Sequence, residues 1–186
     1  MEIYAKQALI NSFTGLLNEK PFEKISVTAI VKRAHVSRNT FYYWYCDIYA
    51  LIDDLLDYET HKIIDDKHDI HSWQEGFVHA TRFVSDNRTA VYHIFNSDCR
   101  TRLNTYFYDV IFNDMTEAVS HDAEGLSVNP HYIVDIAHFY TSALIGLTNR
   151  WLSSDMKEDP YEYIDELGRI FDGNIRLALE RASLEL

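Results

Sequence analysis

The chain has 186 residues, of which 47% are hydrophobic and only three are proline and six glycine. This composition supports a packed core, and it excludes collagen-like and disordered classes. No apolar run approaches the roughly 20 residues of a membrane-spanning helix, and the amphipathic N-terminus lacks a signal-peptide core. Two separated cysteines, Cys46 and Cys99, indicate reduced thiols and a cytoplasmic protein.

The net charge of −12 is unevenly spread along the chain. Residues 1–50 hold six basic and four acidic residues, whereas residues 51–186 hold 11 basic and 25 acidic residues. Such asymmetry is typical of chains in which one segment faces nucleic acid. We therefore treat residues 1–50 as a candidate nucleic-acid-binding domain and residues 51–186 as a second domain.

Helical signals follow one another along the first 60 residues. A first helix is predicted over residues 2–19, and Pro21 ends it. Ser26, Ser37 and Asp47 are the predicted N-caps of three further helices. The second and third of these helices are short, with room for only a tight turn between them.

The rest of the chain carries the same helical period. A helix is expected from Ser72, and a short one from Asn87. Longer helices are expected over about 98–121, 130–154 and 160–183, the last two opened by the pairs Asn129–Pro130 and Asp159–Pro160. No strand pattern or repeat is evident. The predicted fold is all-α: a three-helix helix-turn-helix domain followed by a helical-bundle regulatory and dimerisation domain.

The segment RNTFYYWY, residues 38–45, has too many aromatic side chains to bury them all. A helix-turn-helix needs apolar residues where its two helices touch and an open side toward DNA. The inward positions are filled by Ile30, Ala34, Val36, Phe41 and Trp44.

The outward positions of the same helix carry side chains suited to DNA. Arg and Asn can bind purine edges in pairs of hydrogen bonds, and Thr can contact a base edge, so Arg38, Asn39 and Thr40 are the candidate base contacts. Hydroxyl and ammonium groups suit phosphate oxygens. The candidate backbone contacts are Lys24, Lys32, Tyr42 and Tyr43. Packing of Tyr42 or Tyr43 against another helix is the alternative.

Residues 6–52, with KPFEKISVTAIVKRAHVSRNTFYYWY followed by CDIYALI, resemble the N-terminal domain of the TetR family of bacterial transcription regulators. The resemblance covers about a quarter of the chain. It implies that Ser37 to Tyr45 is the recognition helix, that Thr40 and Tyr42 contact phosphate, and that Asp47 to Leu51 approaches the DNA backbone. It also implies a homodimer on a near-palindromic operator, with repression as the default mode.

Two positions depart from the family pattern. His35 stands where the turn usually has glycine, and His tolerates a positive φ better than most residues. Ile48 replaces a lysine that often follows the cap of the fourth helix, which removes one expected phosphate contact. DNA affinity is therefore expected to depend on the few basic residues that remain: Lys24, Lys32, Arg33 and Arg38.

The last two long helices are apolar on more than one side, so they must bury more than one side. Two from each copy can form a symmetric four-helix interface, as the family resemblance also implies. The dimer candidates are Tyr140, Leu144, Leu147, Trp151, Ile164, Leu167 and Phe171. The alternative is that these helices form the core of a monomer.

The middle of the chain is rich in aromatic residues, and the resemblance implies a ligand cavity there. The pocket candidates are Trp73, Phe77, Phe83, Tyr92, Phe95, Tyr106 and Phe107. An ordinary core is the competing interpretation, and a protein co-regulator is an alternative to a small-molecule effector.

No enzyme motif, cofactor motif or metal-ligand spacing is present. GxSxG, Walker, GxGxxG and HExxH patterns are missing, and the nine histidines lack i, i+4 pairs. We therefore expect a DNA-binding regulator and not an enzyme. The remaining alternative is a dimeric helical scaffold that binds proteins and whose helix-turn-helix is weak or partner-dependent.

Overall fold

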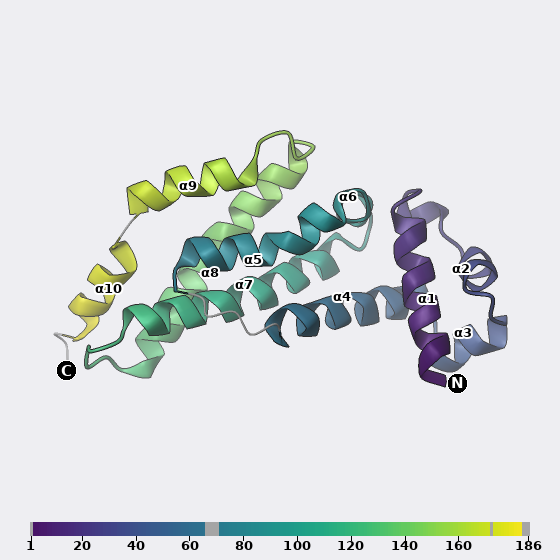
Figure 1. Cartoon of the computed structure of the whole chain (residues 1–186), viewed down its shortest axis with the longest axis horizontal. Helices are drawn as coiled ribbons and strands as arrows, with labels where there is room; N and C mark the ends of the chain where they lie inside the picture. The colour runs from purple at the N-terminus through teal and green to yellow at the C-terminus, as the bar shows by residue number, and fades with distance from the viewer. Residues whose placement is uncertain (1, 66–70, 172, 184–186) are drawn as a thin grey trace. The chain divides into compact units, whose positions relative to one another are not determined.

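The computed structural model describes residues 2–65, 71–171 and 173–183, with side chains except at 2, 3, 63–65, 80–83 and 160. Within these ranges the chain forms helices and no strand, which confirms the predicted all-α class (Figure 1). The helices are α1 (Glu2–Leu17), α2 (Val27–Ala34), α3 (Arg38–Trp44), α4 (Ile48–Asp65), α5 (Trp73–Asp86), α6 (Arg88–Phe95), α7 (Arg100–Asp122), α8 (Pro130–Ser153), α9 (Pro160–Phe171) and α10 (Asn174–Ser183). None of the described helices is long and apolar enough to span a membrane.

The predicted caps place most helix starts correctly. Ser26 Oγ accepts a hydrogen bond from the Ala29 amide at 3.3 Å, and Asp47 Oδ1 accepts one from Ala50 at 2.9 Å. Asn129 does the same for α8 at 3.2 Å. These side chains satisfy amides that have no partner inside a helix, so the polar residue fixes where each helix begins.

Contacts divide the chain into two compact units. Unit 1 comprises Met1–His61 and Phe83–Tyr106, and unit 2 comprises Lys62–Arg82 and Phe107–Leu186. The core of unit 1 lies between α1 and the short helices α2 and α3, together with the first half of α4. Its fully buried side chains include Leu9, Phe13, Ile30, Phe41, Leu51 and Ile52.

Helix α6 and the start of α7 also belong to unit 1. The His93 ring lies 2.7 Å from the carbonyl oxygen of Leu17, at the C-terminus of α1. Arg102 of α7 binds the carboxylate of Asp53 on α4 at 2.5 and 2.6 Å. These contacts join segments about 50 to 80 positions apart in sequence, and the helical period did not predict them.

Unit 2 packs α5, α7 and α8 around an apolar core. Val110, Ile111 and Val119 of α7 are buried, as are Ala137 and Leu144 of α8. The same core holds a polar pair. His79 Nδ1 lies 3.0 Å from Asp114 Oδ2, and both side chains are at least nine-tenths buried.

The prediction of a single helix over residues 160–183 is wrong. Helix α9 ends at Phe171, and α10 begins at Asn174. Gly173 between them has a φ of 69°, a left-handed conformation that interrupts helical hydrogen bonding and that glycine adopts without strain. In the second helix, Arg176 donates to the carbonyl oxygens of Asp122 and Glu124, at 2.7 and 2.9 Å, which docks α10 on the end of α7.

Candidate nucleic-acid interface

The turn between α2 and α3 is built by two polar residues. His35 adopts φ 55° and ψ 38°, the left-handed conformation expected at the position where the family pattern has glycine. The next amide, on Val36, donates to the Val31 carbonyl at 3.1 Å and so closes the end of α2. Ser37 then caps α3, with its Oγ 3.0 Å from the amide nitrogen of Thr40. The predicted helix-turn-helix geometry is therefore set by His35 and Ser37.

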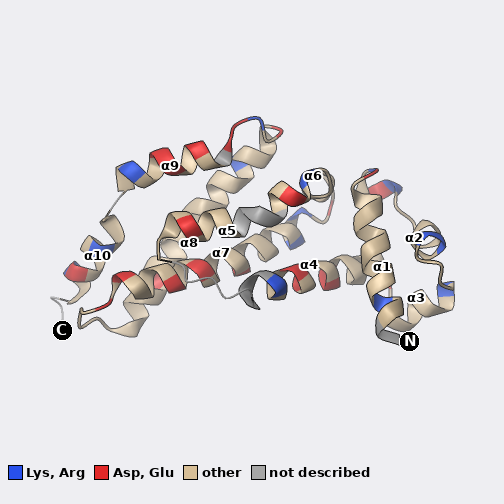
Figure 2. Ribbon diagram, in the orientation of Figure 1, with Lys and Arg blue, Asp and Glu red and all other residues tan. Residues whose placement is uncertain are grey.

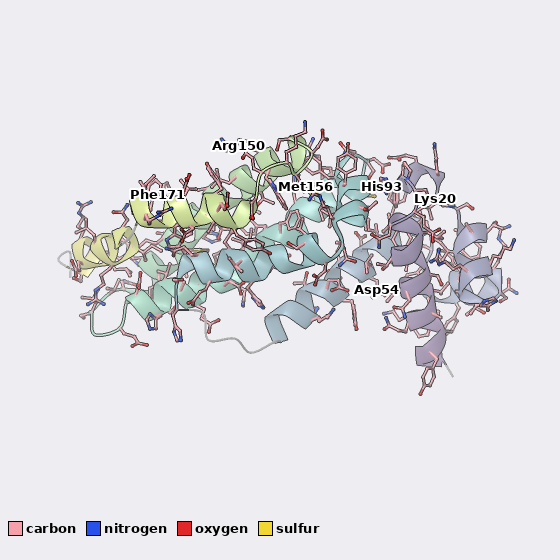
Figure 3. The ribbon with its side chains drawn as sticks, turned by 45° about the horizontal axis from the view of Figure 1, so that its top comes forward. Lys20, Asp54, His93, Arg150, Met156 and Phe171 are labelled. Atoms are coloured by element: carbon pink, nitrogen blue, oxygen red, sulfur yellow. The ribbon has the colours of Figure 1, made fainter. Side chains whose placement is uncertain are left out.

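One side of α3 is anchored in unit 1. Phe41 is fully buried, whereas Trp44, predicted to face inward, is only half-buried, with the Lys6 ammonium 5.8 Å from its ring. The sequence did not single out Tyr45, which is buried. Its hydroxyl donates to Asp54 Oδ2 at 2.6 Å, and the other oxygen of Asp54 binds Lys6 at 2.8 Å. Figure 3 labels Asp54 on α4.

Burial, and secondarily the hydrogen bond to Asp54, raises the pKa of Tyr45 far above its usual range. The tyrosine therefore stays neutral and acts as a donor that ties the end of α3 to α4. No local pattern marks this contact, because Asp54 lies nine residues away on the next helix.

The other side of α3 is open. Arg38 and Asn39 are exposed, and Tyr42 and Tyr43 are 52% and 68% exposed. Both tyrosines therefore face outward, which rules out the alternative that they pack against another helix of the chain. Thr40 is half-buried, and its Oγ1 lies 2.8 Å from Ser37 Oγ. The threonine hydroxyl is thus already engaged in the cap of α3.

Figure 2 marks the basic residues in blue, and those of α2 and the turn before it differ in their surroundings. Lys24 and Lys32 are exposed, as predicted for backbone contacts. Arg33 instead binds Glu19 at 2.5 Å and lies against α1, where a Cβ on Gly15 would come within 2.7 Å of its guanidinium. Arg33 therefore joins α2 to α1, and its expected contribution to DNA affinity stays a prediction.

The start of α4 lacks a basic side chain, as the sequence indicated. Ile48 is half-buried. The neighbouring Tyr49 donates its hydroxyl to Asp98 at 2.7 Å, and this hydrogen bond is the largest cause that raises the pKa of Tyr49. The residues after the cap therefore tie α4 to the segment that precedes α7.

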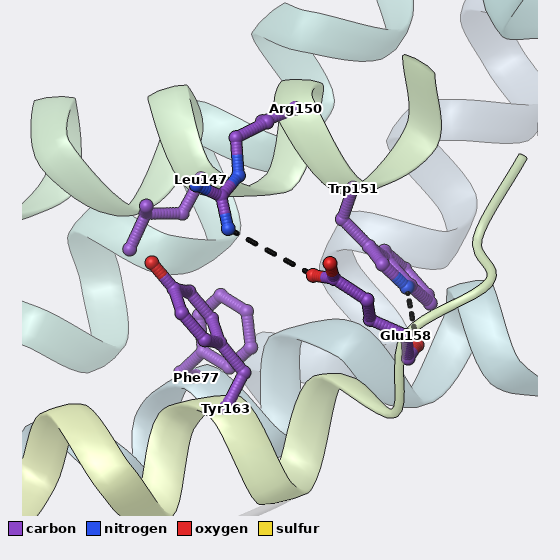
Figure 4. A pocket seen from close by; sticks show the side chains of 6 residues that line it. All are labelled: Phe77, Leu147, Arg150, Trp151, Glu158 and Tyr163. Atoms are coloured by element: carbon purple, nitrogen blue, oxygen red, sulfur yellow. Dashed lines mark hydrogen bonds and ion pairs between the residues drawn. The ribbon is translucent and has the colours of Figure 1, made fainter. Parts of the chain in front are cut away.

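Unit 2 contains a small aromatic pocket with a cavity of about 20 Å³, room for about one water molecule (Figure 4). It is lined by Phe77, Leu147, Arg150, Trp151, Glu158 and Tyr163. Arg150 lies 3.8 Å from the Glu158 carboxylate, and Trp151 Nε1 donates to the Glu158 carbonyl at 2.8 Å. Glu158 thus holds the α8–α9 connection over the pocket.

The predicted pocket residues are divided between the two units. Phe77 is the one that lines the cavity just described, and Trp73 and Phe107 are buried elsewhere in unit 2. Tyr92, Phe95 and Tyr106 belong to unit 1, and the Phe83 side chain lies outside the described residues. Arg150, Glu158 and Tyr163 were not among the predicted pocket residues.

The predicted dimer residues occupy different environments. Leu144 and Ile164 are buried inside the chain, and Phe171 is exposed. The half-buried members are Tyr140, Leu147, Trp151 and Leu167. Among the described side chains, no group of three or more His, Cys, Asp or Glu residues is placed to hold a metal ion.

The C-terminal part of the chain matches a known protein family. Residues 71–173 match the TetR-type family model described as a transcriptional regulator C-terminal region. The HTH-type dhaKLM operon transcriptional activator DhaS of Lactococcus lactis is 22% identical over 125 residues, which cover 67% of this chain and 65% of that relative, just under two thirds of its length.

A solved structure shows the same fold. That of a dihydroxyacetone kinase operon activator DhaS has a TM-score of 0.75 and 16% identity, over 94% of this chain and 98% of that chain. The family match covers more than half of the chain and confirms the family that residues 6–52 resemble. The chain belongs to the TetR family of transcriptional regulators, which are not enzymes.

Proposed function

We propose that the chain is a cytoplasmic homodimer that binds a near-palindromic operator in double-stranded DNA through residues 1–50. Residues 51–186 pair the two copies and carry the response to an effector. The observation that supports this most is the division of α3 into a buried side at Phe41 and an open side with Arg38, Asn39, Tyr42 and Tyr43. A helix held in this way can enter the major groove without unfolding its own core.

The roles of the open residues follow from their chemistry. Arg38 and Asn39 read bases, since a guanidinium and an amide can each make two hydrogen bonds to one purine. Thr40 contributes through its methyl group or by exchanging its bond to Ser37. Lys24, Lys32, Tyr42 and Tyr43 bind phosphates and set the orientation of the helix. Each phosphate contact releases counterions from DNA, so binding weakens as salt rises, and the few cations among these residues give a small salt slope.

Repression by blocking polymerase is the default mode for such a protein. Activation is the second candidate, because both DhaS proteins named above are described as activators. Fusing the selected operator to a reporter distinguishes the two modes, since deletion of the regulator raises expression in the first case and lowers it in the second.

The effector is either a small molecule or a protein co-regulator. The 20 Å³ cavity is too small for a typical metabolite unless the connection bearing Glu158 moves. A ligand that binds here must therefore displace Glu158 from Arg150. No cofactor is required for the proposed activity.

The test is selection of bound sequences from random duplex DNA at about 150 mM salt, where non-specific phosphate binding is weakened. An enriched inverted repeat is expected, and the Arg38→Ala/Tyr42→Ala variant should lose it. Arg169→Ala/Tyr161→Ala is the matched control, because it removes an exposed arginine and tyrosine from α9. No enrichment at low salt would replace this function with the protein-binding scaffold.

A further inference from the structure

Three of the six side chains that line the pocket in unit 2 are aromatic. They are Phe77 of α5, Trp151 of α8 and Tyr163 of α9. Phe77 is only 3% exposed, so the pocket has a buried apolar floor, whereas Arg150 and Glu158 at its edge are exposed. The face of an aromatic ring carries partial negative charge, so a pocket lined by such rings favours a cation over an anion.

A guanidinium of the chain itself already lies in this environment. The Arg150 Cζ is 5.1 Å from the centre of the Tyr163 ring, within the roughly 6 Å range of a cation–π contact. Figure 4 shows the same guanidinium pointing from α8 toward the Glu158 carboxylate. The chain therefore places a cation between an aromatic face and a carboxylate, the two kinds of group that recognise organic cations.

The Arg150 guanidinium is held loosely. Its Nη2 atom lies 3.8 Å from Glu158 Oε2, too far for a hydrogen bond, and the two side chains are 61% and 63% exposed. Exposed ion pairs of this kind contribute little to stability, because water solvates both charges and the long side chains lose entropy. A cation from solution can therefore replace the guanidinium at low cost, while the Glu158 backbone stays bonded to Trp151.

The charge around the pocket also selects a cation. Residues 150–170 contain six acidic residues and three basic ones. Two of the basic side chains already lie beside carboxylates, with Lys157 3.8 Å from Asp155 and Arg169 3.3 Å from Asp165. The third is the guanidinium described above. The field of such a segment attracts small cations and repels anions.

We propose that this pocket binds a small organic cation, an alkylguanidinium or an alkylammonium, in the place that the Arg150 guanidinium now occupies. The inference rests on the proposed response to an effector and specifies the chemical class of that effector. Glu158 supplies the opposite charge, and Tyr163 supplies an aromatic face. A ligand of this size uses the volume that the guanidinium leaves, in addition to the cavity of about 20 Å³, so the connection bearing Glu158 stays in place. Arg150 is then an internal competitor that raises the concentration needed for binding.

The first test follows binding by NMR at the indole of Trp151, one of three tryptophans in the chain. The probe is ethylguanidinium, and the control is N-ethylurea, which has nearly the same shape and no charge. In the Arg150→Ala variant of the full chain, ethylguanidinium should shift the Trp151 indole signal saturably, with a dissociation constant about tenfold below that of wild type, because the competitor is gone. N-ethylurea should cause no saturable shift, and the signals of Trp44 and Trp73 should not move.

The second test removes the proposed contacts one at a time in the Arg150→Ala background. Glu158→Gln keeps the size of the side chain and should raise the dissociation constant for ethylguanidinium about tenfold. Glu162→Gln is the matched control, because it removes an exposed carboxylate of α9 that does not line the pocket. In the same way, Tyr163→Leu should weaken binding, and Tyr161→Leu, at an exposed position of α9, should not. Circular dichroism melts of every variant exclude loss of fold as the cause.

The third test connects the pocket to DNA. Operator binding by the Arg150→Ala variant should change when ethylguanidinium is saturating, compared with sodium chloride at the same ionic strength. The matched salt is needed because any added salt weakens binding to DNA. Glu158→Gln in the same background should remove the response.

The outcomes separate this inference from the proposed function. No saturable shift, equal binding of ethylguanidinium and N-ethylurea, or binding unaffected by Glu158→Gln would overturn the cation site, and an enriched operator would still support the DNA-binding function. Saturable binding that leaves operator affinity unchanged would overturn the assignment of the cation as the effector. A chain that binds ethylguanidinium but selects no operator would overturn the DNA-binding function and support the cation site alone.

Discussion

His35 determines how α3 leaves α2. Its φ of 55° lies in a region that costs little for glycine and more for residues branched at Cβ. We expect His35→Gly to retain or slightly raise stability, and His35→Val to lower the free energy of unfolding by about 1–3 kcal/mol. Denaturant melts of the two variants provide the measurement. Equal stability of the two would mean that the turn relaxes to a different conformation.

Arg38 and Lys32 are both exposed cations, yet their expected roles differ. Arg38→Ala should weaken operator binding by about 1–3 kcal/mol and relax specificity at one base position. Lys32→Ala should weaken all sequences alike and lower the salt slope of binding by about one unit. Competition binding with operators substituted at single positions distinguishes them. A uniform loss for Arg38→Ala would assign this residue to a phosphate instead.

At the scale of the element, Trp151 connects α8 to the loop that follows it. It is half-buried, and its indole donates to the Glu158 carbonyl. We expect Trp151→Ala to lower the free energy of unfolding by about 2 kcal/mol, below the roughly 3–5 kcal/mol of a fully buried tryptophan. The buried neighbour Leu152 is the comparison, and Leu152→Ala should cost at least as much. A melt of Trp151→Ala that matches wild type would contradict the role of this contact.

The sequence predicts a helix boundary well where the signal lies within a few residues of that boundary. Ser26, Ser37 and Asn129 are caps whose effect reaches only three residues, so the sequence placed α2, α3 and α8 correctly. The division at Gly173 was missed because apolar periodicity continues through it. The Tyr45–Asp54–Lys6 network was missed because it depends on how three helices meet.

The candidate DNA-facing residues were predictable for a similar reason. Successive residues of a helix lie about 100° apart, so with Phe41 facing inward Tyr43 falls on the far side of α3 and Tyr42 on its flank, and both are exposed. The pocket was not predictable, because Phe77, Arg150 and Tyr163 come from three helices. Aromatic content alone could not identify which of many buried rings border a cavity.

At the scale of the molecule, the buried His79–Asp114 pair links the stability of unit 2 to pH. Burial is the main cause that raises the pKa of Asp114 above 3.8, its usual value, while His79 and Asn113 oppose it and Glu117 adds to it. Between about pH 4 and this raised pKa, Asp114 is protonated in the folded chain and ionised in the unfolded chain. The free energy of unfolding should therefore fall as pH rises from about 4 through the raised pKa.

Asp114→Asn tests this pH dependence, because the amide cannot titrate. One proton accounts for at most about 1.4 kcal/mol per pH unit. Wild type should lose stability relative to Asp114→Asn as pH rises through this window, as measured by denaturant titration at several pH values. A constant difference would show that folding does not change the pKa of Asp114, and one of opposite sign would show that folding lowers it.

The interleaving of the two units limits how this protein can be recombined with its relatives. The chain passes between unit 1 and unit 2 near residues 61, 82 and 106. A single exchange after α4 would separate α1 from His93, and α4 from Arg102, which both contribute to unit 1. A recombinant that takes residues 1–61 from a relative therefore also needs that relative's α6 and start of α7. Two exchanges must then occur together. This favours divergence of the whole gene by point substitution over shuffling of interchangeable halves.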